Sequence, residues 1–180
     1  MTRSKPQTKI DAIKFRAPEK SDGAAVWELI AHSGSLDQNS LYCNLLQCSH
    51  FAPTCVLAER NDNVVGWLSG YVPPQQPDTY FVWQICVDAE TRGQGLAQRL
   101  LRQALARDAC QGVRRVECTI TRDNTASWAL FVGLARDLGA VIQSELHFDR
   151  QKDFRDRHAS EHLVSIGPFC PDRVDRLHAA

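Results

Sequence analysis

The stretch from Trp83 to Leu101, with the sequence WQICVDAETRGQGLAQRLL, constrains the fold of this chain more than any other feature. It begins as an apolar run with β-branched residues, continues as a polar loop with two glycines, and ends with leucines at helical spacing. This change of period predicts a buried strand, a short loop and an amphipathic helix in direct succession. The beginning of such a helix offers unpaired backbone N–H groups and a partial positive charge, which together attract anions.

The loop from Arg92 to Ala97, RGQGLA, has two interpretations when its residues are taken alone. Glycines allow the backbone to approach a phosphate closely, and Arg92 adds a charged fork, so one interpretation is an anion site. In the other, the glycines serve only the turn before the helix. A dinucleotide-binding fingerprint is excluded because Gln98 stands where a third glycine is needed, and a P-loop is excluded because no Gly-Lys-Ser/Thr follows.

Charge and cysteine usage narrow the classes of partner. The chain has 21 basic and 21 acidic residues, so it lacks the basic excess of a nucleic-acid-binding protein. No apolar run approaches the ~20 residues that span a membrane, so no membrane partner is expected. The seven cysteines form no C-x-x-C pair and their number is odd, which favours neither a metal site nor a disulfide framework. Residues 1–12 lack the apolar centre of a secretory signal, which indicates a flexible N-terminus and a reducing, cytoplasmic location.

The rest of the chain alternates between strand and helix patterns. Strands are predicted at 13–18, 54–60, 64–72, 79–88, 113–121, 141–149 and 161–169, and helices at 21–34, 40–51, 95–110 and 125–140. The expected fold class is α/β, with one mixed, mostly antiparallel sheet and helices on both faces, in a single domain over residues 13–169. The charged segment 150–160 is predicted to be mobile, and residues 170–180 are predicted to be a flexible C-terminal tail.

The glycine loop also carries a family resemblance. Its residues match the R/Q-x-x-G-x-G/A signature of the GNAT superfamily of N-acetyltransferases, and the order of elements over residues 13–149 resembles that superfamily as well. The resemblance implies a GNAT fold and acetyl-CoA as the acetyl donor. It further implies that the cofactor is contacted by Ile85, Val87, Arg92, Gly93, Gln94, Gly95, Leu96, Ala97, Asn124 and Phe131, with the loop on the pyrophosphate and the strand on the thioester.

Several strings resemble a narrower group, the L-2,4-diaminobutyrate acetyltransferases of ectoine biosynthesis. They are SLDQNSLYCNLLQCSHF, FVWQICVD, RGQGLAQRLL, TITRDNTASWALF and the late IGPF. The resemblance implies transfer of an acetyl group from acetyl-CoA to the 4-amino group of L-2,4-diaminobutyrate, which yields the precursor of the osmoprotectant ectoine. It also implies a homodimer that needs no metal. The alternatives are a GNAT enzyme for another amine, such as a polyamine or a protein N-terminus, and a non-catalytic acyl-CoA sensor.

The same resemblance indicates a substrate pocket formed by Asp37, Ser40, Tyr42, Trp83, Asn124, Glu161 and His162, with Asp37, Trp83 and Glu161 as catalytic residues. Several of them have a structural alternative. Either Asn39 or Ser40 could serve only to cap the following helix, Trp83 could be a core residue, and Glu161 with His162 could be surface charge at a strand edge.

One position departs from the superfamily pattern. The tyrosine that often protonates the leaving thiolate is replaced by Phe131, which has no proton to give. Three proton sources remain, namely Tyr42, a water molecule or the amine itself. A thiolate whose conjugate acid has a pKa near ~8.5 also leaves with little help.

Overall fold

The computed structural model describes residues 12–34 and 36–174. Its strands are β1 (Lys14–Arg16), β2 (Val56–Arg60), β3 (Asn63–Tyr71), β4 (Thr79–Val87), β5 (Arg115–Thr121), β6 (Ile142–Phe148) and β7 (Glu161–Ile166). Its α-helices are α1 (Gly23–Ser33), α2 (Leu41–Ser49), α3 (Leu96–Leu105) and α4 (Thr125–Leu138). The order of strands and helices along the chain agrees with the sequence prediction, and the α/β class is confirmed.

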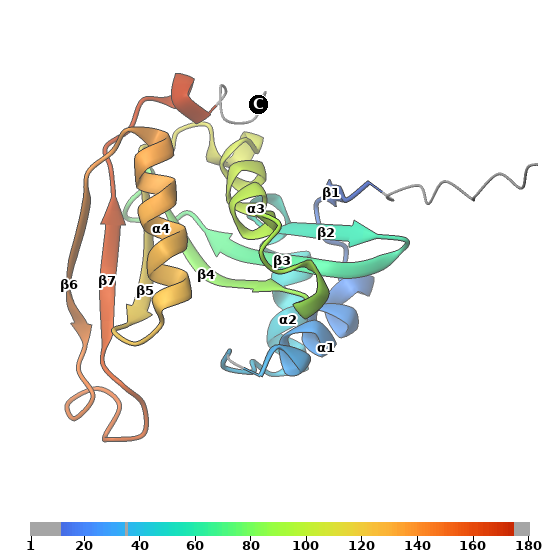
Figure 1. Ribbon diagram of the computed structural model, residues 1–180, viewed down its shortest axis with the longest axis horizontal. Coiled ribbons are helices and arrows are strands. Elements are labelled where there is room, and N and C mark those ends of the chain that lie inside the picture. The colour runs from blue at the N-terminus through green and yellow to red at the C-terminus, as the bar shows by residue number, and fades with distance from the viewer. Residues whose placement is uncertain (1–11, 35, 175–180) are drawn as a thin grey trace, which may run out of the picture.

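The strands form one seven-stranded sheet in the order β1-β2-β3-β4-β5-β7-β6 (Figure 1). Every neighbouring pair is antiparallel except β4 and β5, which are parallel. A parallel pair requires a crossover connection, and α3 provides it between β4 and β5. The mixed, mostly antiparallel sheet predicted from the sequence is therefore confirmed.

Helices cover both faces of the sheet, as predicted (Figure 1). On one face, α3 buries Leu96, Leu100 and Leu101 in the main core, together with the apolar side of α4. On the other face, α1 packs Val26 and Ile30 against β2, β3 and β4 in a second cluster. In each helix the buried residues recur at helical spacing and so form one apolar face. That face packs against the sheet.

β4 and β5 separate after a short stretch of pairing. Their register ends at Phe81, which lies opposite Glu117. Just beyond this point β4 contains a bulge, because Ser69 of β3 pairs with Gln84 whereas Gly70 pairs with Val82. Trp83 is the extra residue, and a bulge of this kind bends its strand. The bulge and the end of the pairing together open a cleft between β4 and β5.

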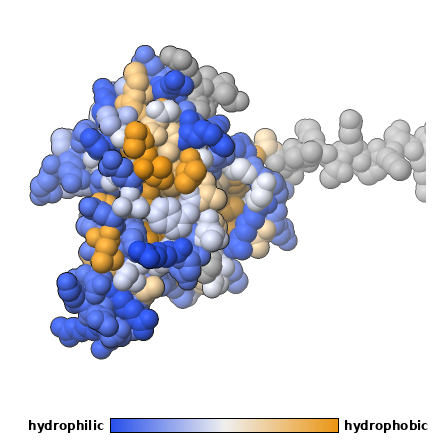
Figure 2. Space-filling model, turned by 60° about the vertical axis from the view of Figure 1, so that its left-hand side comes forward, coloured by the Kyte–Doolittle hydropathy of each residue, from blue (hydrophilic) through white to orange (hydrophobic). Residues whose placement is uncertain are grey.

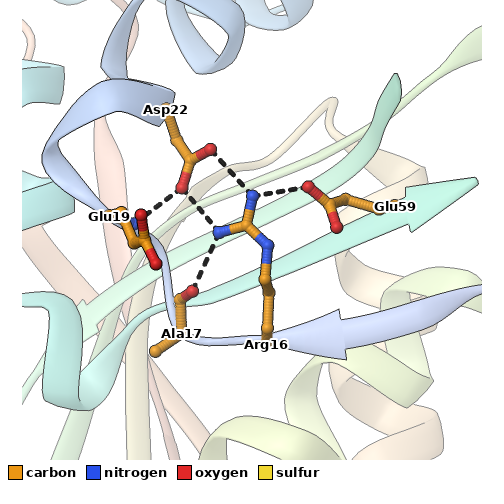
Figure 3. A network of polar contacts seen from close by, with 5 residues as sticks. All are labelled: Arg16, Ala17, Glu19, Asp22 and Glu59. Carbon is orange, nitrogen blue, oxygen red and sulfur yellow. Dashed lines mark hydrogen bonds and ion pairs between the residues drawn. The ribbon is translucent and has the colours of Figure 1, made fainter. Parts of the chain in front are cut away.

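An ion-pair network anchors β1 to its neighbours (Figure 3). The Arg16 guanidinium donates to both carboxylate oxygens of Asp22, at 2.6 and 2.8 Å, and also to Glu59 of β2. Asp22 accepts a further bond from the backbone N–H of Glu19 at 2.6 Å. Arg16 therefore joins β1, the beginning of α1 and β2, and its hydrogen bonds lower the pKa of Asp22.

We expect Arg16→Ala to destabilise the fold without affecting the cleft. The change leaves two partly buried carboxylates without their charged partner, at a cost of about 2 kcal/mol. For a chain of this length, that corresponds to a melting temperature lower by about 4–8 °C. Thermal unfolding followed by circular dichroism measures the shift, and Arg136→Ala, whose side chain is 79% exposed, is the matched control.

The same variant has a defined pH dependence. Because the folded state lowers the pKa of Asp22, this carboxylate contributes stability above its unfolded value of ~3.9 and loses it as the pH falls through the folded value. The difference in melting temperature between wild type and Arg16→Ala should therefore be present at neutral pH and shrink below about pH 4. A difference that stays constant across this range would contradict the assignment to Asp22.

The segment 150–160 forms a hydrogen-bonded loop between β6 and β7, which corrects the expectation of a mobile segment. The backbone N–H of Arg150 donates to the Ser160 hydroxyl at 2.9 Å, and its side chain pairs with Asp156 at 3.0 Å. The ring of Phe154 contacts those of Phe148 and His158. Figure 2 shows a hydrophilic lobe at the lower end of the molecule, below a group of hydrophobic residues. Short-range contacts hold the loop in spite of its charge.

The predicted tails fall largely outside the described residues. Of the predicted N-terminal segment 1–12 only residue 12 is described, and of the predicted tail 170–180 only residues 170–174 are. Val174 is 8% exposed and belongs to the main core. The core therefore extends past residue 169.

Candidate active site

The cleft between β4 and β5 has a volume of about 810 Å³. Its walls are the loop after α1, the edge of β4, the first turns of α3 and α4, the edge of β5, and residues from the β6–β7 loop to the beginning of β7. A cleft of this size, at the point where a sheet opens, is the usual form of a small-molecule site. Its two ends differ in chemistry.

One end of the cleft is formed by the loop from Arg92 to Ala97, called here the signature loop. Gly93 and Gly95 have left-handed φ angles of 74° and 72°, and Gly95 is the N-cap of α3. A Cβ atom built on either glycine meets no heavy atom within 4 Å, so the backbone faces open space. The loop therefore presents the N–H groups of the first turn of α3 to any anion that enters.

The side chains of the signature loop complete this end. Arg92 lines the cleft, and its guanidinium donates to the carbonyls of Val87 at 3.3 Å and Ser33 at 3.4 Å. Leu96 is buried in the core and Ala97 lines the cleft, while the Gln94 side chain turns back to the Glu90 carbonyl. A fixed guanidinium beside unpaired N–H groups can hold a diphosphate.

The other end of the cleft carries two carboxylates joined through a histidine. His158 Nε2 lies 3.4 Å from Asp37 Oδ2, and His158 Nδ1 lies 3.9 Å from Glu161 Oε1. The second Glu161 oxygen, Oε2, is buried and has no hydrogen-bond partner among the described residues. Burial raises the pKa of Glu161, and His158 and Thr119 partly offset this effect. A carboxylate with a raised pKa is a better proton acceptor near neutral pH.

Trp83 is the extra residue in the bulge of β4. Its side chain is 46% exposed and lines the cleft, so the core alternative does not describe it. Its ring lies 6.4 Å from that of Tyr71, edge to face. The bulge holds the indole at the mouth of the cleft, where its N–H can serve a polar ligand.

Three predicted pocket residues do not line the cleft. The Ser40 hydroxyl accepts from the backbone N–H of Cys43 at 3.1 Å and caps α2, which is its structural alternative. Tyr42 is 69% exposed because the buried face of α2 lies at residues 44, 47 and 48. His162 follows Glu161 on β7, so it points to the opposite face of the sheet and accepts from Arg122 Nε at 3.2 Å.

Asn124 and Phe131 both line the cleft from α4. The Asn124 carboxamide oxygen caps α4 by accepting from the Ser127 N–H at 3.0 Å. Phe131 is 4% exposed, and no tyrosine hydroxyl belongs to the lining within the described part of the chain. Tyr42, one of the three proton sources considered from the sequence, therefore lies away from the cleft.

The lining also contains polar residues that were not predicted from the sequence, among them Gln84 and His158. His158 belongs to the segment expected to be mobile. Its signal was its position three residues before Glu161, as the one histidine in a run of arginine, lysine and aspartate. Gln84 had no local signal, because its role depends on the bulge.

Cys86 and Cys118 line the cleft from opposite strands, and both are buried. Burial raises the pKa of Cys86 to about 11 and that of Cys118 well above its usual range. Both thiols are thus protonated at neutral pH and are weak nucleophiles. The described residues contain no group of three His, Cys, Asp or Glu side chains that could hold a metal ion. Within the described ranges, no helix is long and apolar enough to cross a membrane.

The fold and the cleft define a class of protein. The model of the acetyltransferase (GNAT) family matches residues 24–134, and the chain belongs to this family. Among curated proteins, the L-2,4-diaminobutyric acid acetyltransferase of Methylotuvimicrobium alcaliphilum is 50% identical over 163 residues, which cover 91% of this chain and 95% of that protein. The enzyme of the same name from Marinococcus halophilus is 44% identical, covering 89% of this chain and 92% of that protein.

A solved structure is also similar to this chain. The diaminobutyrate acetyltransferase EctA from Paenibacillus lautus, in complex with its substrate L-2,4-diaminobutyric acid and coenzyme A, is 39% identical. It covers 89% of this chain and 97% of its own, with a TM-score of 0.85.

Proposed function

We propose that this chain acetylates the 4-amino group of L-2,4-diaminobutyrate, using acetyl-CoA as the donor. One observation carries the proposal: a single cleft has an anion-binding loop at one end and a carboxylate–histidine cluster at the other. These two ends suit a diphosphate-containing donor and a substrate with two ammonium groups. The similarity to curated diaminobutyric acid acetyltransferases over about nine tenths of the chain supports the same substrate.

The signature loop fits the diphosphate of acetyl-CoA. Gly93 and Gly95 leave open the space that a side chain would fill, and Arg92 stands beside it. Beyond Phe81, the edge of β4 is not paired with β5, so its N–H groups near Ile85 and Val87 can meet the pantetheine and the thioester oxygen. Acetyl-CoA supplies the acetyl group as a reactive thioester.

The other end of the cleft fits the diamino acid. Asp37 and Glu161 offer two carboxylates to two ammonium groups, and His158 lies between them. Trp83 borders the same space with a single N–H donor. The positive charge of the substrate thereby directs its binding to this end, away from Arg92.

The reaction requires a neutral amine, whereas an alkyl ammonium has a pKa near ~10. Glu161 accepts the proton, directly or through water, because burial raises its pKa and its Oε2 has no other partner among the described residues. The amine then attacks the thioester carbon, and the N–H groups of β4 stabilise the charge that develops on the oxygen. The leaving thiolate takes its proton from water or from the amine, since Phe131 has none to give.

The test is an acetyl-transfer assay with L-2,4-diaminobutyrate, with the acetylated nitrogen assigned by NMR. Acetylation confined to nitrogen 4 supports the proposal. Transfer only to spermidine or to peptides would favour a different amine, and the absence of transfer to any amine would favour an acyl-CoA sensor.

Regiochemistry gives a prediction of its own. The 2-amino group is the less basic, so without positioning it would react appreciably, and exclusive 4-acetylation must come from geometry. We expect Asp37→Asn to lower kcat/KM for diaminobutyrate by ~10-fold or more and to allow some 2-acetylation, because one charge that orients the substrate is lost. The control is Asp62→Asn, in the exposed β2–β3 turn. Wild-type turnover with strict 4-acetylation in Asp37→Asn would remove Asp37 from the pocket.

We also propose that the enzyme works as a cytoplasmic homodimer in ectoine synthesis. Support for a reducing compartment comes from the cysteines, all of which are free in the described residues. Support for a dimer comes from the edge strand β6, where Leu146 and Phe148 are 54% and 41% exposed. Light scattering coupled to size-exclusion chromatography measures the mass directly, and a monomer at micromolar concentration would contradict the dimer.

A further inference from the structure

Gln84 makes two hydrogen bonds to the loop that carries Asp37. Its side-chain Nε2 donates to the Asp37 carbonyl at 2.9 Å, and its Oε1 accepts from Asn39 Nδ2 at 3.4 Å. Gln84 lies on the central strand β4, directly after the bulge at Trp83. The loop, residues 36–40, joins α1 to α2 and has no strand or helix of its own.

The side chain of Asp37 is itself poorly held. It is 89% exposed, and its charged contact is His158 at 3.4 Å. Its position therefore depends on the backbone of the loop, which is fixed by Gln84 from the sheet. On the other side, the indole N–H of Trp27 in α1 donates to the Asn39 carbonyl at 3.1 Å.

Glutamine suits this position because its carboxamide has both a donor and an acceptor. The donor reaches a backbone carbonyl and the acceptor reaches an amide N–H, so both groups are used. A glutamate would lose the donor and place a negative charge beside the Asp37 carbonyl. The bulge re-aims side chains on β4, and Trp83 and Gln84 both line the cleft although they are neighbours in the chain.

We infer that Gln84 is a positioning residue that sets the affinity for the diamino acid by holding Asp37 in place. The inference rests on the proposed function, since it assigns Asp37 to the substrate. Two other roles are open to a polar residue in this place, namely direct contact with the substrate and general stabilisation of the fold. The three roles predict different effects on the two KM values, on the melting temperature and on the additivity with Asp37→Asn.

The experiment compares Gln84→Met, which removes both hydrogen bonds at similar volume, with Gln143→Met, the same change at an exposed position of β6. We expect Gln84→Met to raise KM for L-2,4-diaminobutyrate by about tenfold, the effect of losing two modest hydrogen bonds. KM for acetyl-CoA should stay near wild type, and the melting temperature should fall by no more than the few degrees that two modest hydrogen bonds are worth. Equal losses in both KM values, or a large fall in melting temperature, would indicate a structural role and overturn the inference.

A double-mutant cycle with Asp37→Asn separates positioning from direct contact. If Gln84 acts through Asp37, Gln84→Met should raise KM by less than about threefold in the Asp37→Asn background, because the effects of coupled residues are not additive. Additive effects would overturn the inference in favour of direct contact. A wild-type protein that does not acetylate diaminobutyrate would instead contradict the proposed function, which is a separate outcome.

Discussion

Glu161→Gln should lower kcat for acetylation of diaminobutyrate by a factor of ~10²–10⁴, the usual worth of a positioned general base. The change keeps the shape of the side chain and removes its ability to accept a proton. Its KM for acetyl-CoA should stay near wild type, because the signature loop lies at the other end of the cleft. Steady-state kinetics with each substrate varied in turn separates the two parameters.

The pH profile gives a second measure of the same variant. A general base must be ionised, so wild-type kcat/KM should fall on the acid side as Glu161 becomes protonated. Burial raises the pKa of Glu161, so this limb should lie above the range of an ordinary glutamate. In Glu161→Gln the limb assigned to this residue should be absent.

Glu117→Gln is the matched control. Glu117 lies on β5, on the same face of the sheet as Glu161, but it accepts from the Ser165 hydroxyl and does not line the cleft. The control should keep wild-type kcat. A Glu161→Gln variant that also keeps more than half of the wild-type kcat would show that another group removes the proton.

The strand–loop–helix unit around the signature loop could be read from the sequence because its signals are local. The apolar run, the two glycines and the helical leucines each act within a few residues, and their order alone fixes the topology of a crossover unit. The same is true of the cap of α2, for which Ser40 was one of two candidates. Local sequence signals are therefore enough to predict such elements.

The parts that were missed depend on contacts between distant residues. The bulge at Trp83 exists only in the register of β4 against β3, so neither strand alone reveals it or the place of Gln84. The loop 150–160 looks mobile by composition, yet it is held by contacts such as that of Phe154 with Phe148, and it carries His158 to the cleft. The amino-acid composition of a segment indicates how readily it is solvated, but it gives no information about its contacts with residues elsewhere in the chain.

The Glu161–His162 pair illustrates a further limit. The resemblance assigned both residues to the pocket, but successive residues of a strand point to opposite faces. Glu161 therefore enters the cleft, while His162 is buried under the α4 side with Arg122 as its partner. The strand pattern of 161–169 already implied this separation.

Gly95→Val should weaken acetyl-CoA binding by a factor of ~10² or more. Gly95 has a φ of 72°, which a β-branched residue adopts only with strain, and its added side chain would fill the open space above the first turn of α3. Two or more charge-assisted N–H bonds to the diphosphate would then be lost, each worth ~1.5–3 kcal/mol. Isothermal titration with coenzyme A measures the change in Kd directly, and Arg92→Ala should weaken binding by ~10-fold or more for the same reason.

A valine at a positive φ strains the backbone and lowers stability wherever it is placed. The control must therefore be a glycine that also has a positive φ but lies outside the proposed cofactor site. Gly139 is the C-cap of α4, with a φ of 62° and its nearest neighbour, the Arg173 guanidinium, at an ordinary 3.7 Å. Gly139→Val should therefore lower the melting temperature about as much as Gly95→Val, while leaving the Kd for coenzyme A near wild type. If both glycine variants lose affinity equally, the effect is general destabilisation. If Gly95→Val and Arg92→Ala both bind coenzyme A as wild type does, the diphosphate lies elsewhere in the cleft.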